Sequence, residues 1–488
     1  KITYSVNLSG KVNYDPVFTA FLPGLKAFEP ITVVAKISSE NPLLPISGNI
    51  NLQSIKYDSL NIKDLNFDFS GNGTALTFKA NTAEILQNDF RIRNASLSGS
   101  LENNVADFAL SVKDSLEKEI HALHGFVKSE NNALRVSFDE EGTRLFYEPW
   151  AGNPYGYFEY SKAGIKFSDV IFTNAGSQIV RVSTLNDQSN GPLHVFAQNL
   201  DLNFFSRAIY RDSTLLSGTL DTDIELVNYM SDNLSFTGDY TIKNLIYQKN
   251  SLGDLNGVAK SISKNEIYLS TELSGPNNEV KIAGSFFPND GQKIDIDLKL
   301  KKLDMAIVEP FLKDIFYSLK GEMEGDFKVK GSLDNPAISG VAIIKTLEGR
   351  MVQTGALLKI SDQKFNLAER HLQLKDLIIS DENNQKLTVN GDINLENLPD
   401  FEYKLSLAGK DFKLIDNKKG KNDLFYGTGY FDSDLTIKGK NNTFRLEGDV
   451  VLGKKTNLTL LMEDESEIGS EMLEIVEFVS SKKEKNTE

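Results

Sequence analysis

The sequence contains few residues that could do chemistry, and their spacing argues against an active site. His121 and His124 are close enough along the chain to suggest metal ligands, but residues three apart in a strand point to opposite faces. Serine, histidine and aspartate are all present, yet no G-x-S-x-G nucleophile elbow occurs. Cysteine is absent, which removes thiol nucleophiles, disulfides and cysteine-bound metals.

Two glycine motifs match phosphate-binding loops only in part. The run Gly448–Thr456 contains a Gly-Lys pair, but Lys455 stands where such a loop needs Ser or Thr. The run Gly427–Gly429 is a lone G-x-G. We interpret both as structural. The sequence therefore predicts a protein that is not an enzyme, with no catalytic residues, no cofactor and no metal site.

Composition narrows the class of protein. Hydrophobic residues make up 40% of the 488 positions and charged residues 25%, as in a folded domain. The net charge of −15 argues against a nucleic-acid partner. No stretch approaches the ~18 apolar residues that a membrane span needs. Because the chain opens at Lys1 inside a strand-like pattern, we expect a piece of a longer protein whose targeting segment or anchor lies elsewhere.

Apolar and polar residues alternate through most of the sequence. Ile294, Ile296 and Leu298 show the pattern, which indicates strands with one apolar and one solvated face. Helical patterns are scarce. The best one begins at Pro310 and carries a stripe to Leu319, and a weaker one covers residues 204–209.

Several glycines lie on the apolar side of the predicted strands. Gly391 is in phase with Val389 and Ile393, and Gly448 is in phase with Leu446. A glycine inside a strand usually marks a bend or a close approach of another chain segment. Ordinary sandwich packing around a bulky partner is the alternative. Since the placement recurs, we favour curvature of the sheet toward its apolar face.

The chain repeats itself at a spacing of roughly 100 residues. A glycine precedes an aspartate by five residues at 218–223, 321–326 and 429–434, and another glycine follows 14 or 15 residues later. These matches predict an N-terminal part of a β-trough at 1–199, repeats at 200–302 and 303–410, a partial repeat at 411–462, and a charged linker or short helix at 463–488.

Repeats of this kind bury their apolar faces against neighbours and build elongated bodies. An open sheet rarely exceeds ~10 strands without curling. We therefore predict an all-β fold: an elongated, curved, mostly antiparallel sheet that forms an open trough with an apolar interior and few short helices. The side chains expected to line this interior, here called the groove residues, are Phe327, Val329, Leu387, Val389, Ile393, Leu405, Leu407, Leu435, Ile437, Phe444, Leu446 and Val450.

The segment Leu319–Gly355 resembles the repeat signature of the TamB family. A glycine-spaced strand is followed by a short linker to Pro336, then by Gly340 and a further strand. Asn390–Ile393 is similar to the repeat closure of that family. Lys455–Val479 resembles the junction before the C-terminal domain in Bacteroidetes-type members. AsmA-like proteins, which are related, are the main alternative.

The resemblance is clearest over residues 200–480. It implies a periplasmic location in a diderm bacterium and an anchor in the inner membrane. Proteins of this family form long hydrophobic β-grooves linked to phospholipid transport and to assembly of outer-membrane proteins. The implied partners are phospholipids and a TamA-type barrel of the BamA superfamily. We expect this chain to lack both the anchor and the C-terminal domain, so the barrel contact is assigned to no residue.

Three functions remain open on the sequence. The first is a lipid conduit, which the repeats, the in-phase glycines and the uncovered apolar face favour. The second is a scaffold that offers strand edges to nascent barrel proteins. The third is a structural β-rich surface protein, although the nearest candidate for a calcium loop, Asp381–Asn384, has the composition of a turn.

Overall fold

The computed structural model describes residues 5–38, 45–87, 90–174, 177–203, 206, 215–231, 233–397, 400–420, 424–441 and 443–461. The chain divides into two compact units, unit 1 at Lys1–Asp297 and unit 2 at Leu298–Glu488. Hydrogen bonding assigns the 32 strands of the described residues to a single antiparallel sheet. The all-β class expected from the alternating pattern is confirmed.

Unit 1 begins with strands that are joined mostly by short turns. They are β1 (Ser5–Val12), β2 (Leu25–Phe28), β3 (Ile31–Ser38), β4 (Ile46–Tyr57), β5 (Leu60–Gly71), β6 (Ala75–Gln87), β7 (Phe90–Glu102), β8 (Val105–Lys113) and β9 (Glu119–Glu130). Shorter strands follow: β10 (Ala133–Phe138), β11 (Thr143–Leu145), β12 (Glu148–Gly152), β13 (Tyr157–Ser161), β14 (Gly164–Ser168), β15 (Val170–Asn174) and β16 (Gln178–Thr184). Unit 1 continues with β17 (Leu193–Asp201), β18 (Leu216–Val227), β19 (Ser235–Tyr247), β20 (Asn250–Ser263), β21 (Glu266–Ser274) and β22 (Glu279–Phe287).

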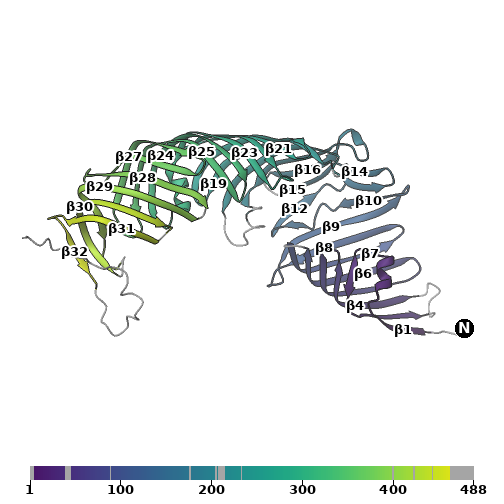
Figure 1. Cartoon of the computed structure of the whole chain (residues 1–488). Coiled ribbons are helices and arrows are strands. Elements are labelled where there is room, and N and C mark those ends of the chain that lie inside the picture. Colours follow the sequence, from purple (N-terminus) through teal and green to yellow (C-terminus); the bar gives the residue numbers. More distant parts are fainter. Residues whose placement is uncertain are drawn as a thin grey trace, which may run out of the picture. The chain divides into compact units, whose positions relative to one another are not determined.

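The unit boundary falls inside β23 (Lys293–Asp304). Unit 2 then contains β24 (Phe316–Ser332), β25 (Asn335–Met351), β26 (Leu357–Ala368), β27 (His371–Ser380), β28 (Lys386–Asn397), β29 (Asp400–Asn417), β30 (Phe425–Lys440), β31 (Thr443–Leu452) and β32 (Asn457–Leu460). From β24 to β31 each strand pairs with the next one along the chain. Figure 1 draws the last of these strands in green to yellow.

The sheet is open rather than closed into a barrel. At one edge β1 pairs with β3, and β2 pairs with β4. At the other edge β31 and β32 each pair with a different part of β30. Every residue of β1 and of β31 is exposed. An open antiparallel sheet agrees with the expected open trough.

Besides Asn203 and Ser206, which are α-helical, the helices of the described residues are short 3-10 segments. They are η1 (Pro16–Ala20), η2 (Leu185–Asp187), η3 (Met305–Ile307) and η4 (Glu309–Phe311). The helix predicted from Pro310 to Leu319 is wrong, because β24 already begins at Phe316. The Glu309 carboxylate accepts a hydrogen bond from the backbone N–H of Leu319 at 2.7 Å, which holds this corner in place. The weaker candidate at 204–209 lies mainly outside the described residues.

Many strands contain one residue whose backbone is left-handed. Such residues, nearly all Asp or Asn, have φ between 47° and 56° and are Asp64, Asn94, Asn199, Asn244, Ser318, Asp362, Asp376 and Asp411. Asp and Asn tolerate this conformation better than other residues with a Cβ atom. At Asn199, Asn244, Asp376 and Asp411 the pairing register also shifts, as in a β-bulge. A bulge bends its strand and increases the local twist, so these positions curve the sheet.

The bulges explain part of the sequence repeat. The carboxylate of Asp221 accepts a hydrogen bond from the N–H of Asn199 at 2.6 Å, and Asp432 does the same for Asp411 at 2.6 Å. Both acceptors stand three residues after a repeat glycine. Asn390 caps Asp376 in the same way, at 2.7 Å. Asp221 and Asp432, at equivalent places in two of the repeats, thus satisfy a backbone donor that the bulge removes from the strand pairing.

Candidate functional site

The groove residues of β28 to β31 meet one another across the sheet. Directly opposite residues in antiparallel strands have their side chains on the same face. The register forms the rows Val389–Leu407–Leu435, Gly391–Leu405–Ile437–Leu446 and Ile393–Tyr403–Gly439–Phe444, with Leu387 opposite Gly409 and Val450 opposite Ser433. These residues therefore form a continuous apolar surface over the four strands.

One row extends the same face to β24. Its members pair in sequence and are Phe327, Gly340, Leu367, Leu372 and Ile393. Val329 stands two residues after Phe327 and shares its face. The structure thus brings all of the groove residues together on one face of unit 2. That this face holds lipid stays a prediction.

Burial changes along this face. Val389 and Leu387 are only 4% and 7% exposed, and they form a packed cluster with Leu374, Leu377 and Phe412. On β31 the exposed fractions rise to 59% for Phe444, 46% for Leu446 and 47% for Val450. The face is therefore well covered around β28 and open to solvent at β31.

The in-phase glycines bring neighbouring backbones close together. Gly391 and Gly448 have φ of 141° and 134°, which L side chains rarely adopt. A Cβ atom on Gly391 would lie 2.0 Å from the carbonyl oxygen of Lys404, and one on Gly448 would lie 2.2 Å from that of Asp434. Glycine is required at both positions by backbone conformation and by close approach.

Unit 1 has a second apolar row that sequence reasoning missed. Its members are rich in phenylalanine and glycine and pair across β3 to β10 in the order Ala35, Gly48, Phe69, Phe78, Gly99, Phe108, Gly125 and Phe138. A Cβ on Gly48 would lie 2.5 Å from Cζ of Phe69, one on Gly99 3.0 Å from Cζ of Phe78, and one on Gly125 3.1 Å from Cζ of Phe108. The aromatic rings therefore lie flat over neighbouring glycines.

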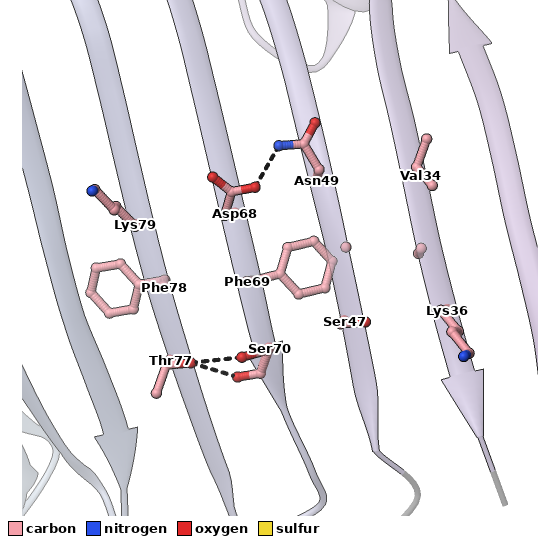
Figure 2. A pocket seen from close by; sticks show the side chains of 12 residues that line it. Val34, Lys36, Ser47, Asn49, Asp68, Phe69, Ser70, Thr77, Phe78 and Lys79 are labelled. Atoms are coloured by element: carbon pink, nitrogen blue, oxygen red, sulfur yellow. Dashed lines mark hydrogen bonds between the residues drawn. The ribbon is translucent and has the colours of Figure 1, made fainter.

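Figure 2 shows this arrangement at β4 to β6, where the rings of Phe69 and Phe78 turn away from each other toward the flanking strands. A hollow of about 520 Å³ adjoins these residues. Asn49 donates to Asp68 at 2.6 Å among the polar residues that line it. The signal for this row was available in the sequence as phenylalanine and glycine residues in phase with one another on successive strands.

A polar cluster lies at the end of β29 in unit 2. Asp381 is fully buried and accepts a hydrogen bond from the backbone N–H of Lys413 at 2.8 Å. The ammonium group of Lys413 contacts Glu382 at 2.5 Å and Asp416 at 3.1 Å. Burial alone would lower the pKa of Lys413, but the hydrogen bonds that its ammonium group donates to Glu382 and Asp416 outweigh burial and raise the pKa. The paired charges of this cluster have a structural role. Asp381 also begins the turn expected at 381–384.

The histidines are placed as the strand periodicity predicts. His121 pairs with Val112 and His124 with Ala109, so their side chains lie on opposite faces of β9. Among the described residues, no group of three His, Asp or Glu side chains is arranged to hold a metal ion. Trp150 is only 4% exposed and packs with Ala197 and Leu200.

The fold and this face define a class of protein: an open-sheet β-repeat protein with a long apolar face. Over the residues that the structure describes, no helix is long and apolar enough to cross a membrane. Residues 373–488 match the family model of the TamB C-terminal domain. This match confirms the resemblance to the TamB family, a transport and assembly family of the bacterial outer membrane. No curated protein matches the chain.

The match corrects one expectation. The chain was predicted to lack the C-terminal domain of the family, and that prediction is wrong, because the matched region covers residues 373–488. The match includes 463–488, predicted as a linker or short helix, which lies outside the described residues. The prediction was wrong because the glycine patterns are degenerate: a repeat and the C-terminal domain share the same alternation and glycine spacing.

Proposed function

We propose that the apolar face of this protein binds the acyl chains of phospholipids and conducts them between the inner and outer membranes of a diderm bacterium. In this proposal the protein works in the periplasm with a barrel of the BamA superfamily and is anchored in the inner membrane through a segment outside this chain. It has no catalytic role. One observation carries the proposal: the register joins the groove residues into one apolar surface from β24 to β31.

The exposed end of this surface also supports the proposal that it binds acyl chains. Phe444, Leu446 and Val450 keep roughly half of their area in solvent, and covering them with hydrocarbon would remove that area from water. Each methylene group of a lipid that is shielded there contributes about 0.8 kcal/mol. Many such contacts in a row favour a long, flexible alkyl chain over a compact ligand.

Native mass spectrometry of the purified chain tests the proposal, by asking for co-purified phospholipid. We expect Leu446→Asp to remain folded, because Leu446 is 46% exposed, and to lose bound lipid, because a carboxylate among alkyl chains costs several kcal/mol. The matched control is Thr443→Asp, which lies on the opposite face of the same strand and should retain lipid. A wild-type chain without lipid, or equal lipid in both variants, would contradict the proposal.

Among the described residues β31 pairs on one side only, and this edge favours a second candidate, a scaffold for the assembly of outer-membrane barrel proteins. Each residue of β31 is exposed, and the strand pairs with β30 along one side. An extended strand could add to its other side through backbone hydrogen bonds. A photo-crosslinker at Arg445 would capture barrel-protein strands if the scaffold role holds, whereas a crosslinker at Leu446 would capture phospholipid if the conduit role holds.

A further inference from the structure

His121 lies on the apolar face of unit 1, where β9 meets the hairpin of β11 and β12. Ala122 pairs with Arg144, so His121 and Leu145 lie together on the other face of the sheet. That face carries the cluster of Trp150, Ala197 and Leu200, against which Leu145 packs. An ionisable ring is therefore placed beside an apolar cluster.

The tip of the β11–β12 hairpin contacts this ring. The Phe146 ring meets the His121 ring edge to face, with centroids 4.5 Å apart. The backbone N–H of Phe146 donates to Nδ1 of His121 at 3.4 Å. Accepting this hydrogen bond requires an unprotonated Nδ1, which places the proton of the neutral ring on Nε2.

The tip has a strained backbone that needs outside support. Phe146 and Tyr147 have φ of 49° and 70°, and a left-handed conformation costs such residues about 1 kcal/mol or more each. Tyr147 is held by three contacts: its N–H donates to the Ile120 carbonyl at 2.9 Å, its hydroxyl to Asp114 at 3.0 Å, and its carbonyl accepts from Arg144 at 2.7 Å. Phe146 is held against His121.

We propose that His121 is an acid-released latch that fixes the Phe146–Tyr147 tip to β9 while its ring is neutral. Protonation turns Nδ1 from an acceptor into a donor, so the Phe146 N–H faces another N–H. It also puts a charge on an apolar face. Both changes favour release of the tip from β9.

The pKa shifts of His121 and of Asp114 have different causes. Burial lowers the pKa of His121 below its usual value, so the neutral ring is favoured in the folded state. Backbone N–H groups of Lys118 and Leu116 hold the pKa of Asp114 below its usual range. The Asp114 contact to Tyr147 therefore keeps its charge at pH 5.5.

Other charged groups lie on the elements packed here. Glu119 on β9 accepts from Ser111, and Lys113 on β8 pairs with Glu117 at 3.5 Å. Lys118 lies over the Tyr147 ring at 4.9 Å. Burial and Asp114 raise the pKa of Tyr147, so its hydroxyl stays protonated. Arg144 and Glu148 are the charged residues of the β11–β12 hairpin.

Amide hydrogen exchange of the full chain at pH 7.5 and 5.5, corrected for intrinsic exchange rates, tests the latch. In the wild type we expect the protection of the amides of residues 143–152 against exchange to fall about tenfold for each pH unit over which His121 titrates. The amides of β4 to β7 should keep their protection. The His121→Phe variant retains the ring contact but cannot titrate, so its residues 143–152 should stay protected at both pH values. His124→Gln, on the opposite face of the same strand, should behave as the wild type does.

His121→Gln provides a second variant in case Phe disturbs the fold, since its amide oxygen can accept from the Phe146 N–H. It should also remove the pH dependence. The latch is overturned if wild-type protection of 143–152 is equal at both pH values. It is also overturned if folded His121→Gln loses protection in acid as the wild type does. Lipid is not needed for the measurement, so the result is independent of the proposed conduit.

Discussion

Units 1 and 2 build their apolar faces in different ways. In unit 1 phenylalanine rings lie flat over glycines of the next strand, as Phe69 does over Gly48. In unit 2 branched aliphatic side chains pack into a cluster around Val389, which is 4% exposed. Glycine therefore has two roles. It makes room for a ring, as at Gly48 in unit 1 and at Gly439 beside Tyr403 in unit 2, and it lets backbones approach closely, as at Gly99 in unit 1 and at Gly391 in unit 2.

The largest effect should follow from a charge in the packed cluster of unit 2. We expect Val389→Asp to destabilise this unit by about 3 kcal/mol or more, because a buried carboxylate finds no partner among Leu374, Leu377 and Phe412. Thr388→Asp, on the opposite face of β28, is the control and should change stability little. Chemical denaturation monitors both. Equal stability of the two variants would show that the cluster is open to water.

A smaller effect is expected from a methyl group in the aromatic row of unit 1. A Cβ on Gly48 would lie 2.5 Å from Phe69 Cζ and 2.7 Å from the Val34 carbonyl oxygen. The ring can move but the backbone resists, so Gly48→Ala should cost about 1–3 kcal/mol. Gly10→Ala meets nothing within 4 Å and should be neutral in the same thermal unfolding assay. A neutral Gly48→Ala would mean that the ring does not need its glycine.

The side chains that cap the bulges should contribute less to the stability of the fold than Gly48 does. Asp221→Ala leaves the Asn199 N–H without its acceptor and should cost about 1–2 kcal/mol. Asp221→Asn keeps a side-chain oxygen and should lose less. Hydrogen exchange at Asn199 reports the local effect. Unchanged exchange in the alanine variant would show that the bulge holds without its cap.

The same cap has a defined pH dependence. The Asn199 N–H, and next Lys243 at 2.9 Å, lower the pKa of Asp221 in the folded state. Its contribution to stability is therefore complete above the unfolded pKa of a carboxyl group and is lost as pH falls through the lower, folded value. Denaturation midpoints measured between pH 6 and pH 3 should fall less in Asp221→Asn than in the wild type. Parallel curves would contradict the assignment.

The smallest effect is expected from the histidines. Replacing His121, His124, His194 and His371 together with glutamine should leave lipid binding intact at neutral pH, since none is assigned a catalytic or metal role. The contacts of His194 to Asp223 at 2.5 Å and of His371 to Asp392 at 3.2 Å are partly exposed, and such pairs contribute little. Loss of function in a folded variant would reveal a site that was missed.

One structural feature could have been read from the sequence and was not. Alternation changes phase at the left-handed residues: Leu372 and Leu374 precede Asp376, and Leu377 and Ile379 follow it, all on one face. A one-residue slip would normally turn a strand over. An Asp or Asn at such a slip is the signal of a bulge. The slip also gives a strand helix-like spacing, and after Pro310 it occurs at Ser318, where no Asp or Asn marks it. This spacing misled the prediction of a helix.

The sequence by itself determined the strand pattern, the repeat and the membership of the groove residues in one alternating set. These are local properties, since period-2 alternation and glycine spacing follow from the geometry of a single strand. Only the tertiary structure decided which residues are opposite one another and how far each is covered. Phe412 is 2% exposed and Phe444 is 59% exposed, although both continue apolar alternations. The difference arises because Phe412 follows the bulge at Asp411 into the packed cluster, whereas Phe444 stands on a strand that, among the described residues, has a neighbour on one side only.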